Sequence, residues 1–389
     1  MTPAARIAAA IEILDTILTG EPVDKVVPNW GRANRYAGSG DRAAIRTHVF
    51  DALRCRRSFA WRGGAETGRG LMIGLARAQG LEVNDLFSGN KFAPSVLSAD
   101  EQEQPDIAQA PRAVQLDCPD WLEPRFDADL GEHSSAILTA LQTRAPVFLR
   151  VNTAKSDRDA VIEALAEHTI QTQPHALSPT ALEVTENPRR VAASDAYTNG
   201  LVELQDAASQ AVVDLLPVDA ASRVLDFCAG GGGKSLGIAA RGAAQIVAHD
   251  AIVARMKDLP QRAERAGAKI EIVETEDLSG REFDLVLCDV PCSGSGSWRR
   301  NPEAKWALSA DRLAELTGLQ REILRDAAPH TRLGGTLAYI TCSLFAEENR
   351  AQIDGFVARN KAWQLVSDHS FSPLQGGDGF YLALLTRVS

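Results

Sequence analysis

Hydrophobic and polar positions follow a helical pattern in the first part of the chain. Over residues 1–80, Ala, Leu, Ile and Arg recur at the three- and four-residue spacing of amphipathic helices, with a glycine-rich break at Gly38–Gly40. The stretch 98–111 is polar, acidic and contains proline, which is typical of a loop or linker. We therefore predict a helical domain over residues 1–135.

From residue 146 the pattern changes to short strands. Val147–Asn152 alternates apolar and polar residues as a strand does, and Ser156–His168 is an amphipathic helix opened by a Ser/Asp cap. Two short strand-like stretches follow before Gly200. This order predicts a small βαββ unit, which we place within residues 136–205.

Over residues 206–389, strands alternate with helices. Helical stretches separate five apolar strands, and a strand pair through residues 379–386 closes the chain; the strands lie in S-R-V-L-D-F-C-A-G, A-Q-I-V-A-H-D, K-I-E-I-V-E, F-D-L-V-L-C-D-V-P and G-G-T-L-A-Y-I-T-C-S. This alternation predicts an α/β domain with a doubly wound, mostly parallel sheet. In such sheets ligands bind at the carboxyl ends of the strands, and the distinctive residues of this chain all lie at those ends.

Composition narrows the class of protein. The 389 residues are 45% hydrophobic and 24% charged, and the longest apolar runs have the length of a strand, far below the roughly 20 residues of a membrane span. Glu12 and Asp15 interrupt the apolar start, so we interpret it as a helix and not as a signal peptide. The six cysteines form no C-x2-C pair, so neither a zinc site nor a disulfide framework is expected. We expect a cytoplasmic monomer without a metal.

The net charge of −10 is unevenly distributed. Residues 1–80 carry twelve Lys and Arg against seven Asp and Glu, whereas residues 81–140 carry three against twelve. Only charges within about one Debye length, ~8–10 Å, contribute strongly at a surface, so a basic face can still bind phosphates. Charge alone is equally consistent with solvated surfaces.

A glycine-rich loop follows the first strand of the α/β domain. Four consecutive glycines, Gly230–Gly233, lie between a strand ending at Asp226 and a helix, and they let the backbone approach a ligand closely. Asp250 ends the next strand, where a carboxylate accepts hydrogen bonds from ribose hydroxyls, and Asp277 follows the third strand, within reach of an adenine amino group. The competing interpretation is a structural turn with surface acids.

The same loop resembles a phosphate-binding P-loop, but two residues argue against that function. The pattern G-x4-G-K-[ST] requires glycine where this chain has Cys228. The carboxylate of Asp226 would also repel phosphate, whereas it would attract a sulfonium ligand that carries an ammonium group.

Two thiols lie at the ends of the fourth and fifth strands. Asp289 and Cys292 begin D-V-P-C-S-G-S-G, and Cys342 ends a strand in Y-I-T-C-S. These strands are neighbours in a doubly wound sheet, so both thiols and the glycine-rich loop are predicted to share one cleft. A thiolate that adds to carbon 6 of cytosine makes carbon 5 nucleophilic enough to accept a methyl group, and Asp289 is placed to hold the base edge. Lys234, Arg299 or Arg300 would favour the thiolate.

Together these motifs resemble the Sun/RsmB-type family of RNA cytosine-C5 methyltransferases, over roughly residues 144–389. The resemblance rests on the motifs L-R-V-N (Leu149–Asn152), L-Q-D-A-A-S-Q (Leu204–Gln210), the glycine-rich loop with Lys234, D-x4-R (Asp250 to Arg255), D-V-P-C-S-G-S-G, R-R-N-P-E-A-K-W, Y-I-T-C-S and G-G-D-G-F-Y (Gly376–Tyr381).

The resemblance implies a Rossmann-like class I methyltransferase domain, a small RRM-like unit and an N-terminal helical domain that is weakly NusB-like. It implies that Cys342 is the nucleophile, that Cys292 promotes product release, and that Asp289 and Lys234 assist. It also implies that the protein binds S-adenosyl-L-methionine and methylates ribosomal RNA. The implied cofactor-binding residues are Cys228, Ala229, Gly230, Gly231, Gly232, Gly233, Lys234, Asp250, Arg255, Asp277 and Asp289, and the implied RNA-binding residues are Arg150, Arg299 and Arg300.

The chain departs from the family pattern in its loop. The usual loop reads closer to C-A-A-P-G-G-K-T, whereas this chain has glycine at positions 230 and 231. Three alternatives stay open at the level of sequence. They are a methyltransferase that acts on transfer RNA, an enzyme of the same fold that acts on protein or a small molecule, and a non-catalytic ribosome-assembly factor that binds RNA.

Overall fold

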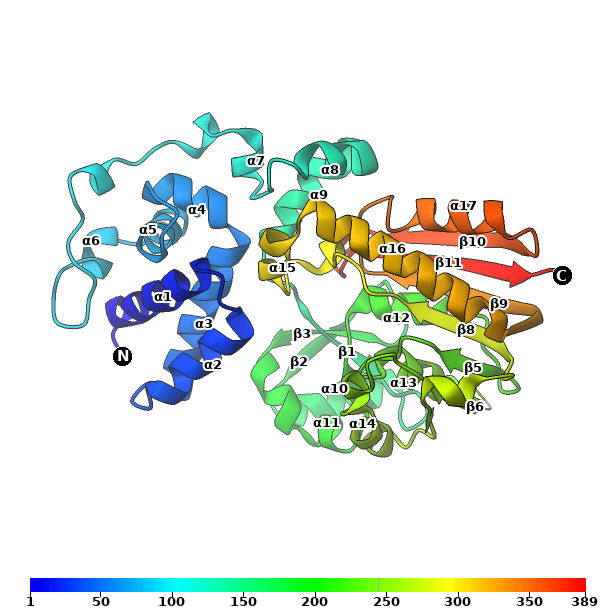
Figure 1. Ribbon diagram of the computed structural model, residues 1–389. Helices are drawn as coiled ribbons and strands as arrows, with labels where there is room; N and C mark the ends of the chain where they lie inside the picture. Colours follow the sequence, from blue (N-terminus) through cyan, green and yellow to red (C-terminus); the bar gives the residue numbers. More distant parts are fainter. Residues whose placement is uncertain (244) are drawn as a thin grey trace. The chain divides into compact units, whose positions relative to one another are not determined.

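The computed structural model describes residues 1–243 and 245–389, which form two compact units (Figure 1). The first unit contains Met1–Arg144 together with Trp298–Ala307, and the second contains Ala145–Ser297 and Leu308–Ser389. The mixed helical and α/β architecture predicted from the sequence is confirmed. The chain leaves the second unit for ten residues and then returns, so the units do not follow each other simply along the sequence.

The first unit is helical throughout. Its helices are α1 (Pro3–Leu18), α2 (Val23–Ala33), α3 (Ser39–Arg54), α4 (Arg56–Gly63), α5 (Gly68–Ala78), α6 (Val83–Leu86), α7 (Arg112–Gln115), α8 (Glu123–Leu130), α9 (Ser134–Leu141) and α15 (Pro302–Ala307). The acidic stretch between α6 and α7 contains only short 3-10 turns, at Asp100–Gln102 and Ile107–Gln109.

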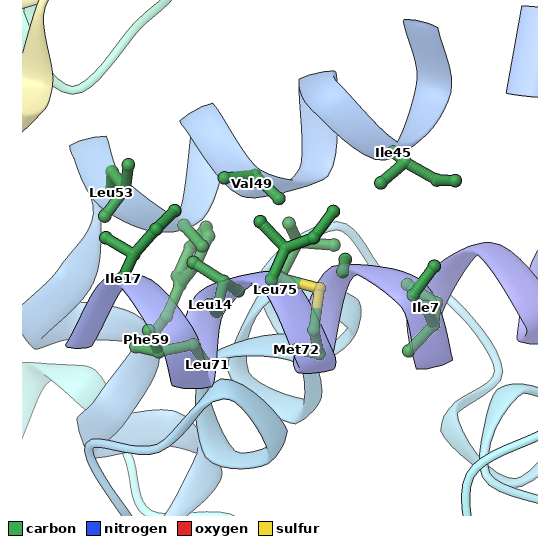
Figure 2. Packing of buried hydrophobic residues seen from close by; sticks show 14 of the residues in the cluster. Ile7, Leu14, Ile17, Ile45, Val49, Leu53, Phe59, Leu71, Met72 and Leu75 are labelled. Carbon is green, nitrogen blue, oxygen red and sulfur yellow. The ribbon is translucent and has the colours of Figure 1, made fainter. Parts of the chain in front are cut away.

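Helices α1, α3, α4 and α5 build the core of the first unit, because their apolar residues recur at helical spacing and face one another. Figure 2 shows this packing: α1 contributes Ile7, Leu14 and Ile17, and side chains from the other three helices pack against it. The other labelled members are Ile45, Val49, Leu53, Phe59, Leu71, Met72 and Leu75.

The segment Trp298–Ala307 packs within the first unit. The Trp298 side chain is 1% exposed and packs edge-to-face on Phe126, with ring centroids 6.0 Å apart. Three hydrogen bonds join the segment to the end of α3: Arg54 Nε donates to the Arg299 carbonyl (2.7 Å), Lys305 Nζ to the Arg54 carbonyl (3.0 Å) and Trp306 Nε1 to the Leu53 carbonyl (2.6 Å).

A four-stranded antiparallel sheet opens the second unit. Its strands are β1 (Val147–Val151), β2 (Gln171–Pro174), β3 (Ala181–Glu186) and β4 (Val202–Leu204), in the spatial order β2-β3-β1-β4, with α10 (Arg158–Glu167) between β1 and β2 and α11 (Asp195–Thr198) before β4. The sequence predicts the β1–α10–β2–β3 part of this sheet. Strand β4 has only three residues, too few for periodicity to reveal.

A seven-stranded sheet with the order β10-β11-β9-β8-β5-β6-β7 forms the rest of the second unit. The strands from β9 to β7 run parallel, and β10 and β11 are antiparallel. The elements are α12 (Ala207–Asp214), β5 (Arg223–Asp226), α13 (Gly233–Ala240), β6 (Gln245–Ala248), α14 (Leu259–Ala266), β7 (Glu271–Ile272), β8 (Phe283–Asp289), α16 (Ala310–Ala327), β9 (Thr331–Thr341), α17 (Arg350–Arg359), β10 (Trp363–Phe371) and β11 (Phe380–Arg387).

Alternate residues of the seven-stranded sheet pack on opposite faces, as the period of a strand requires. Leu225 and Val286 join a cluster with α16 and α17, whereas their neighbours Val224 and Leu285 join a cluster with α12 and α13. The sheet is therefore covered by helices on both sides, which is the doubly wound arrangement. Every helix in the described parts of the chain is too short or too polar to cross a membrane.

Candidate active site

The distinctive residues meet at the carboxyl edge of the parallel strands. Asp226 ends β5, Asp289 ends β8, Asp250 lies two residues after β6, and Cys342 directly follows β9. In the ladders, Asp226 is paired with Leu287 of β8, and Asp289 with Ile340 of β9. The strand ends are thus in register, which brings side chains from four strands to the site that the fold favours for ligands.

The glycine-rich loop between β5 and α13 needs glycine at particular positions. Gly230 and Gly232 have φ values of 51° and 76°, in the left-handed region that other residues rarely adopt. A Cβ atom on Gly232 would also lie 2.1 Å from Leu259 Cδ1 of α14. At Gly232 the loop therefore has room for backbone alone against α14.

We expect the substitution Gly232→Ala to destabilise the second unit by roughly 2–4 kcal/mol, because left-handed strain adds to overpacking against Leu259. Gly280→Ala is a matched control, since Gly280 has a φ of 71° and a Cβ there would have no heavy atom of the described residues within 4 Å, so it should cost only about 1–2 kcal/mol. Chemical denaturation of both variants measures the difference. Equal losses would show that the contact with Leu259 relaxes freely.

Asp250 is held rigidly beside the loop. Its Oδ2 accepts a hydrogen bond from the Gly230 amide (3.0 Å) and lies 3.5 Å from Arg255 Nη1, and its Oδ1 accepts from the Ile252 amide (2.9 Å). The preceding residue, His249, bridges the Phe227 carbonyl (2.8 Å) and the Thr275 hydroxyl (2.9 Å). His249 thus ties the loop after β5 to the turn that contains Asp277, a role that no sequence motif indicates.

Asp226 lies beneath the loop and is 1% exposed. Its Oδ2 accepts a hydrogen bond from the Ser235 hydroxyl (2.6 Å), and its buried Oδ1 has no partner among the described residues. Burial raises the pKa of this carboxyl to about 7, and the nearby Asp289 adds to that rise. Acidic side chains therefore lie close together at the end of β5, directly beside the backbone of the glycine-rich loop.

The two predicted thiols are in contact. Cys292 Sγ and Cys342 Sγ are 3.5 Å apart, although 50 residues separate them in the chain. The hydrogen bond from Cys292, supported by the charge of Lys234, lowers the pKa of Cys342, and the Ser297 hydroxyl also points at Cys342 Sγ (3.9 Å). The same hydrogen bond, together with burial and Glu348, raises the pKa of Cys292. The two shifts have opposite directions, so Cys342 is the thiol of the pair that ionises at the lower pH.

We expect alkylation of Cys342 by iodoacetamide to begin at a lower pH than for an ordinary cysteine, because its lowered pKa makes thiolate available earlier as pH rises. In Cys292→Ala the hydrogen-bond donor is lost, so the midpoint should move to higher pH. Cys292→Ser keeps a donor and is the matched control. Mass spectrometry of the peptide containing Cys342 measures the midpoint, and a midpoint that Cys292→Ala leaves unchanged would contradict this assignment.

Lys234 and Asp289 form an ion pair beside the thiols. Lys234 Nζ lies 2.5 Å from Asp289 Oδ2 and 5.3 Å from the centroid of the Phe380 ring. The lysine side chain is buried, whereas the side chain of Asp289 is 35% exposed. The lysine thus fixes one carboxylate oxygen while the carboxylate stays accessible to a ligand.

A buried carboxylate that the sequence analysis did not identify joins the two thiol loops. Glu348 is fully buried and accepts hydrogen bonds from the Ser293 amide (2.8 Å), from the hydroxyls of Ser293 and Ser343, and from Gln320 Nε2 (2.9 Å). Ser293 follows Cys292 and Ser343 follows Cys342, so Glu348 connects the residues next to both thiols. No local pattern distinguishes this buried glutamate from the adjacent Glu347, which is only half-buried.

The other predicted cofactor residues are also located. Cys228 is half-buried with a pKa raised by burial, and the Ala229 amide donates to the His249 carbonyl (2.8 Å). Arg255 lies beside Asp250. Asp277 is exposed and accepts a hydrogen bond from the Glu274 amide within its own turn (3.3 Å).

Two of the three arginines predicted to bind RNA are buried instead. Arg150 is 4% exposed and donates to the Gly233 carbonyl (2.6 Å) under the loop, and Arg299 is 3% exposed in the first unit. A guanidinium in such a place does not lie on a surface that RNA reaches, so the structure corrects these two expectations. Arg300 is half-buried and remains a predicted RNA contact.

The groups at this edge fit a cationic ligand better than a triphosphate. The carboxylates of Asp226, Asp250 and Asp289 lie beside the loop together with Lys234, and the loop itself offers backbone without side chains. Carboxylates accept hydrogen bonds from ribose hydroxyls and attract an ammonium or sulfonium group, whereas they repel phosphate. The arrangement therefore suits a nucleoside that carries a positively charged amino-acid arm.

Two family models match this chain, and the second of them begins within the first unit. The model described as 16S rRNA methyltransferase RsmB/F matches residues 213–385, and the one described as the ferredoxin-like domain of RsmF/B-like methyltransferases matches residues 118–191.

Curated relatives are identical to this chain at about a third of the matched positions. Proteins named ribosomal RNA small subunit methyltransferase B are 34% identical in Citrobacter koseri and 36% identical in Sodalis glossinidius, each over 284 residues. These matches cover 69% of this chain and 66% and 65% of the two relatives, so the matched part falls just short of two thirds of their length. Among solved structures, the crystal structure of PH0851 shares the fold with a TM-score of 0.80, at 23% identity, over 100% of this chain and 99% of that one.

Proposed function

We propose, from the premise that this chain belongs to the RsmB/F family of rRNA methyltransferases, that it methylates carbon 5 of a cytosine in small-subunit ribosomal RNA. The methyl donor is S-adenosyl-L-methionine, which supplies a methyl group activated by a positively charged sulfur. The observation that carries the proposal is the contact between Cys292 and Cys342 beside the glycine-rich loop. Methyl transfer to an already strong nucleophile would not need two thiols in contact, one of them with a lowered pKa.

Cys342 acts first. Its thiolate adds to carbon 6 of the flipped cytosine, which forms the sulfur–carbon bond and moves the ring electrons toward carbon 5. Asp289, held by Lys234, accepts hydrogen bonds from the N3 and amino edge of the base and so favours the protonated ring that this addition needs. Carbon 5 would then form a bond to the methyl group, and the bond between that methyl group and the donor sulfur would break with its electron pair staying on the sulfur.

Cys292 acts in the release step. Once Cys342 is bonded to carbon 6, it no longer accepts the hydrogen bond that raises the pKa of Cys292, so Cys292 loses its proton to water more readily. The Cys292 thiolate then takes the proton from carbon 5. The double bond between carbons 5 and 6 forms again, and the sulfur–carbon bond breaks with its electrons returning to Cys342.

Methyl transfer to RNA from a strain that lacks this protein tests the proposal. Purified enzyme is incubated with labelled S-adenosyl-L-methionine and total RNA, and the product is mapped by nuclease digestion and mass spectrometry. We expect label in 5-methylcytosine at a single position of small-subunit ribosomal RNA. Label in transfer RNA, in another base or in protein would overturn the assignment, and RNA binding without label would indicate an assembly factor.

A further inference from the structure

The composition of the glycine-rich loop gives its backbone high conformational freedom. Between Ala229 and Lys234 every residue is glycine, and Gly230 and Gly232 adopt left-handed conformations. Each glycine loses more conformational entropy on ordering than another residue does, by the equivalent of roughly 0.5–1 kcal/mol relative to alanine. A loop of this composition holds one conformation only if its surroundings fix the backbone.

Two arginines from different elements fix the carbonyls of this loop. Arg262, from α14, donates through Nη1 to the Gly231 carbonyl. Arg150, from β1 of the four-stranded sheet, donates through Nη1 to the Gly233 carbonyl at 2.6 Å and to the side chain of Gln205. Hydrogen bonds from charged donors are the stronger kind, and here they reach alternate residues of the loop.

A buried glutamate connects these arginines. Glu203 is 2% exposed and lies directly opposite Arg150 in the ladder between β1 and β4. Its carboxylate accepts from Arg262 Nη2 at 3.0 Å and from Arg265, whose guanidinium lies over the Tyr197 ring at 4.3 Å. Burial lowers the pKa of Arg150 to about 10, which still leaves it charged at neutral pH. The small sheet therefore reaches the loop of the large sheet in two ways, directly through Arg150 and indirectly through Glu203, which holds Arg262.

We propose that Arg262 and Arg150 are positioning residues for the cofactor, and that the small sheet contributes to cofactor binding by ordering the loop before the ligand arrives. The inference rests on the proposed function, since it takes the loop to be the binding site of S-adenosyl-L-methionine. Neither arginine contacts the reacting atoms. They act through their hydrogen bonds to the carbonyls of Gly231 and Gly233. These hydrogen bonds restrict the backbone of a loop that lacks the proline of the C-A-A-P-G-G-K-T pattern.

Arg265 provides a matched control, because it pairs with Glu203 as Arg262 does, while the bond to the Gly231 carbonyl comes from Arg262. The experiment compares the full chain with Arg262→Gln and Arg265→Gln. In the ligand-free protein, hydrogen–deuterium exchange of the peptide covering residues 226–240 should be faster in Arg262→Gln, by about tenfold, and unchanged in Arg265→Gln. Affinity for S-adenosylhomocysteine, measured by calorimetry, should fall about tenfold in Arg262→Gln alone.

The variant Arg262→Lys separates loss of loop ordering from loss of folding. It keeps the positive charge opposite Glu203 but loses the forked guanidinium. It should exchange faster in the loop and bind S-adenosylhomocysteine more weakly than the wild type, with an unchanged thermal midpoint. If the wild type itself does not bind S-adenosylhomocysteine, the proposed function fails. If the wild type binds and the Arg262 and Arg265 variants behave alike in both measurements, the positioning role is wrong while the proposed function stands.

Discussion

The variant Cys342→Ala is expected to lose methyl transfer to RNA by on the order of 10⁴-fold or more, because it removes the thiolate that adds to carbon 6. Carbon 5 of cytosine is too weak a nucleophile to accept a methyl group without that addition. Cys342 combines a lowered pKa with a position at the end of β9, beside the carboxylate of Asp289. Single-turnover methylation with labelled donor measures the loss directly.

Cys288→Ala is the matched control for this experiment. Cys288 is fully buried in β8, four residues before Cys292, and its pKa is raised well above the ordinary value by burial. The control removes a buried thiol beside the site that has no assigned role in the reaction, so methylation should persist. The covalent mechanism is wrong if Cys342→Ala methylates RNA at a rate comparable to that of Cys288→Ala.

Replacement of Cys292 by alanine is expected to trap the enzyme on its RNA. Without the second thiol, the adduct between Cys342 and carbon 6 forms and is methylated, but the proton on carbon 5 is not removed and the sulfur–carbon bond does not break. The covalent complex should therefore accumulate as a slowly migrating band on a denaturing gel, with multiple turnover reduced by roughly 10²-fold or more.

The double variant Cys292→Ala, Cys342→Ala gives the control, since it should form no adduct. Omission of S-adenosyl-L-methionine separates a methylated from an unmethylated adduct, because only the former contains label. A Cys292→Ala enzyme that turns over normally and leaves no band would assign product release to another group.

Much of this site follows from the rule that ligands bind at the carboxyl ends of parallel strands. The sequence predicts where β5, β6, β8 and β9 end, and the structure brings Asp226, Asp250, Asp289 and Cys342 to those ends. The contact between Cys292 and Cys342 follows because β8 and β9 are adjacent in the sheet. Their catalytic roles remain predictions for the experiments above.

The pattern of residues along the chain does not predict which polar side chains the fold buries, or with which partners. Glu348 and Glu203 resemble surface acids in the chain, and only the fold buries them among hydroxyls and arginines. Arg150 and Arg299 illustrate the converse error, because a basic residue beside a motif suggests a phosphate contact until its side chain is seen to be enclosed. Periodicity reports the face of an element, but it does not report which polar residue on that face has a partner.

The ten residues from Trp298 to Ala307 belong to the first unit, so the second unit cannot be separated from it by a single truncation. Deletion of the first 144 residues would leave Trp298 without the Phe126 ring and Lys305 without the Arg54 carbonyl. The apolar indole would then face water immediately after Ser297, whose hydroxyl points at the Cys342 sulfur. A shortened catalytic fragment should consequently be prone to aggregate, and inactivity measured on it would say little about the roles of its thiols.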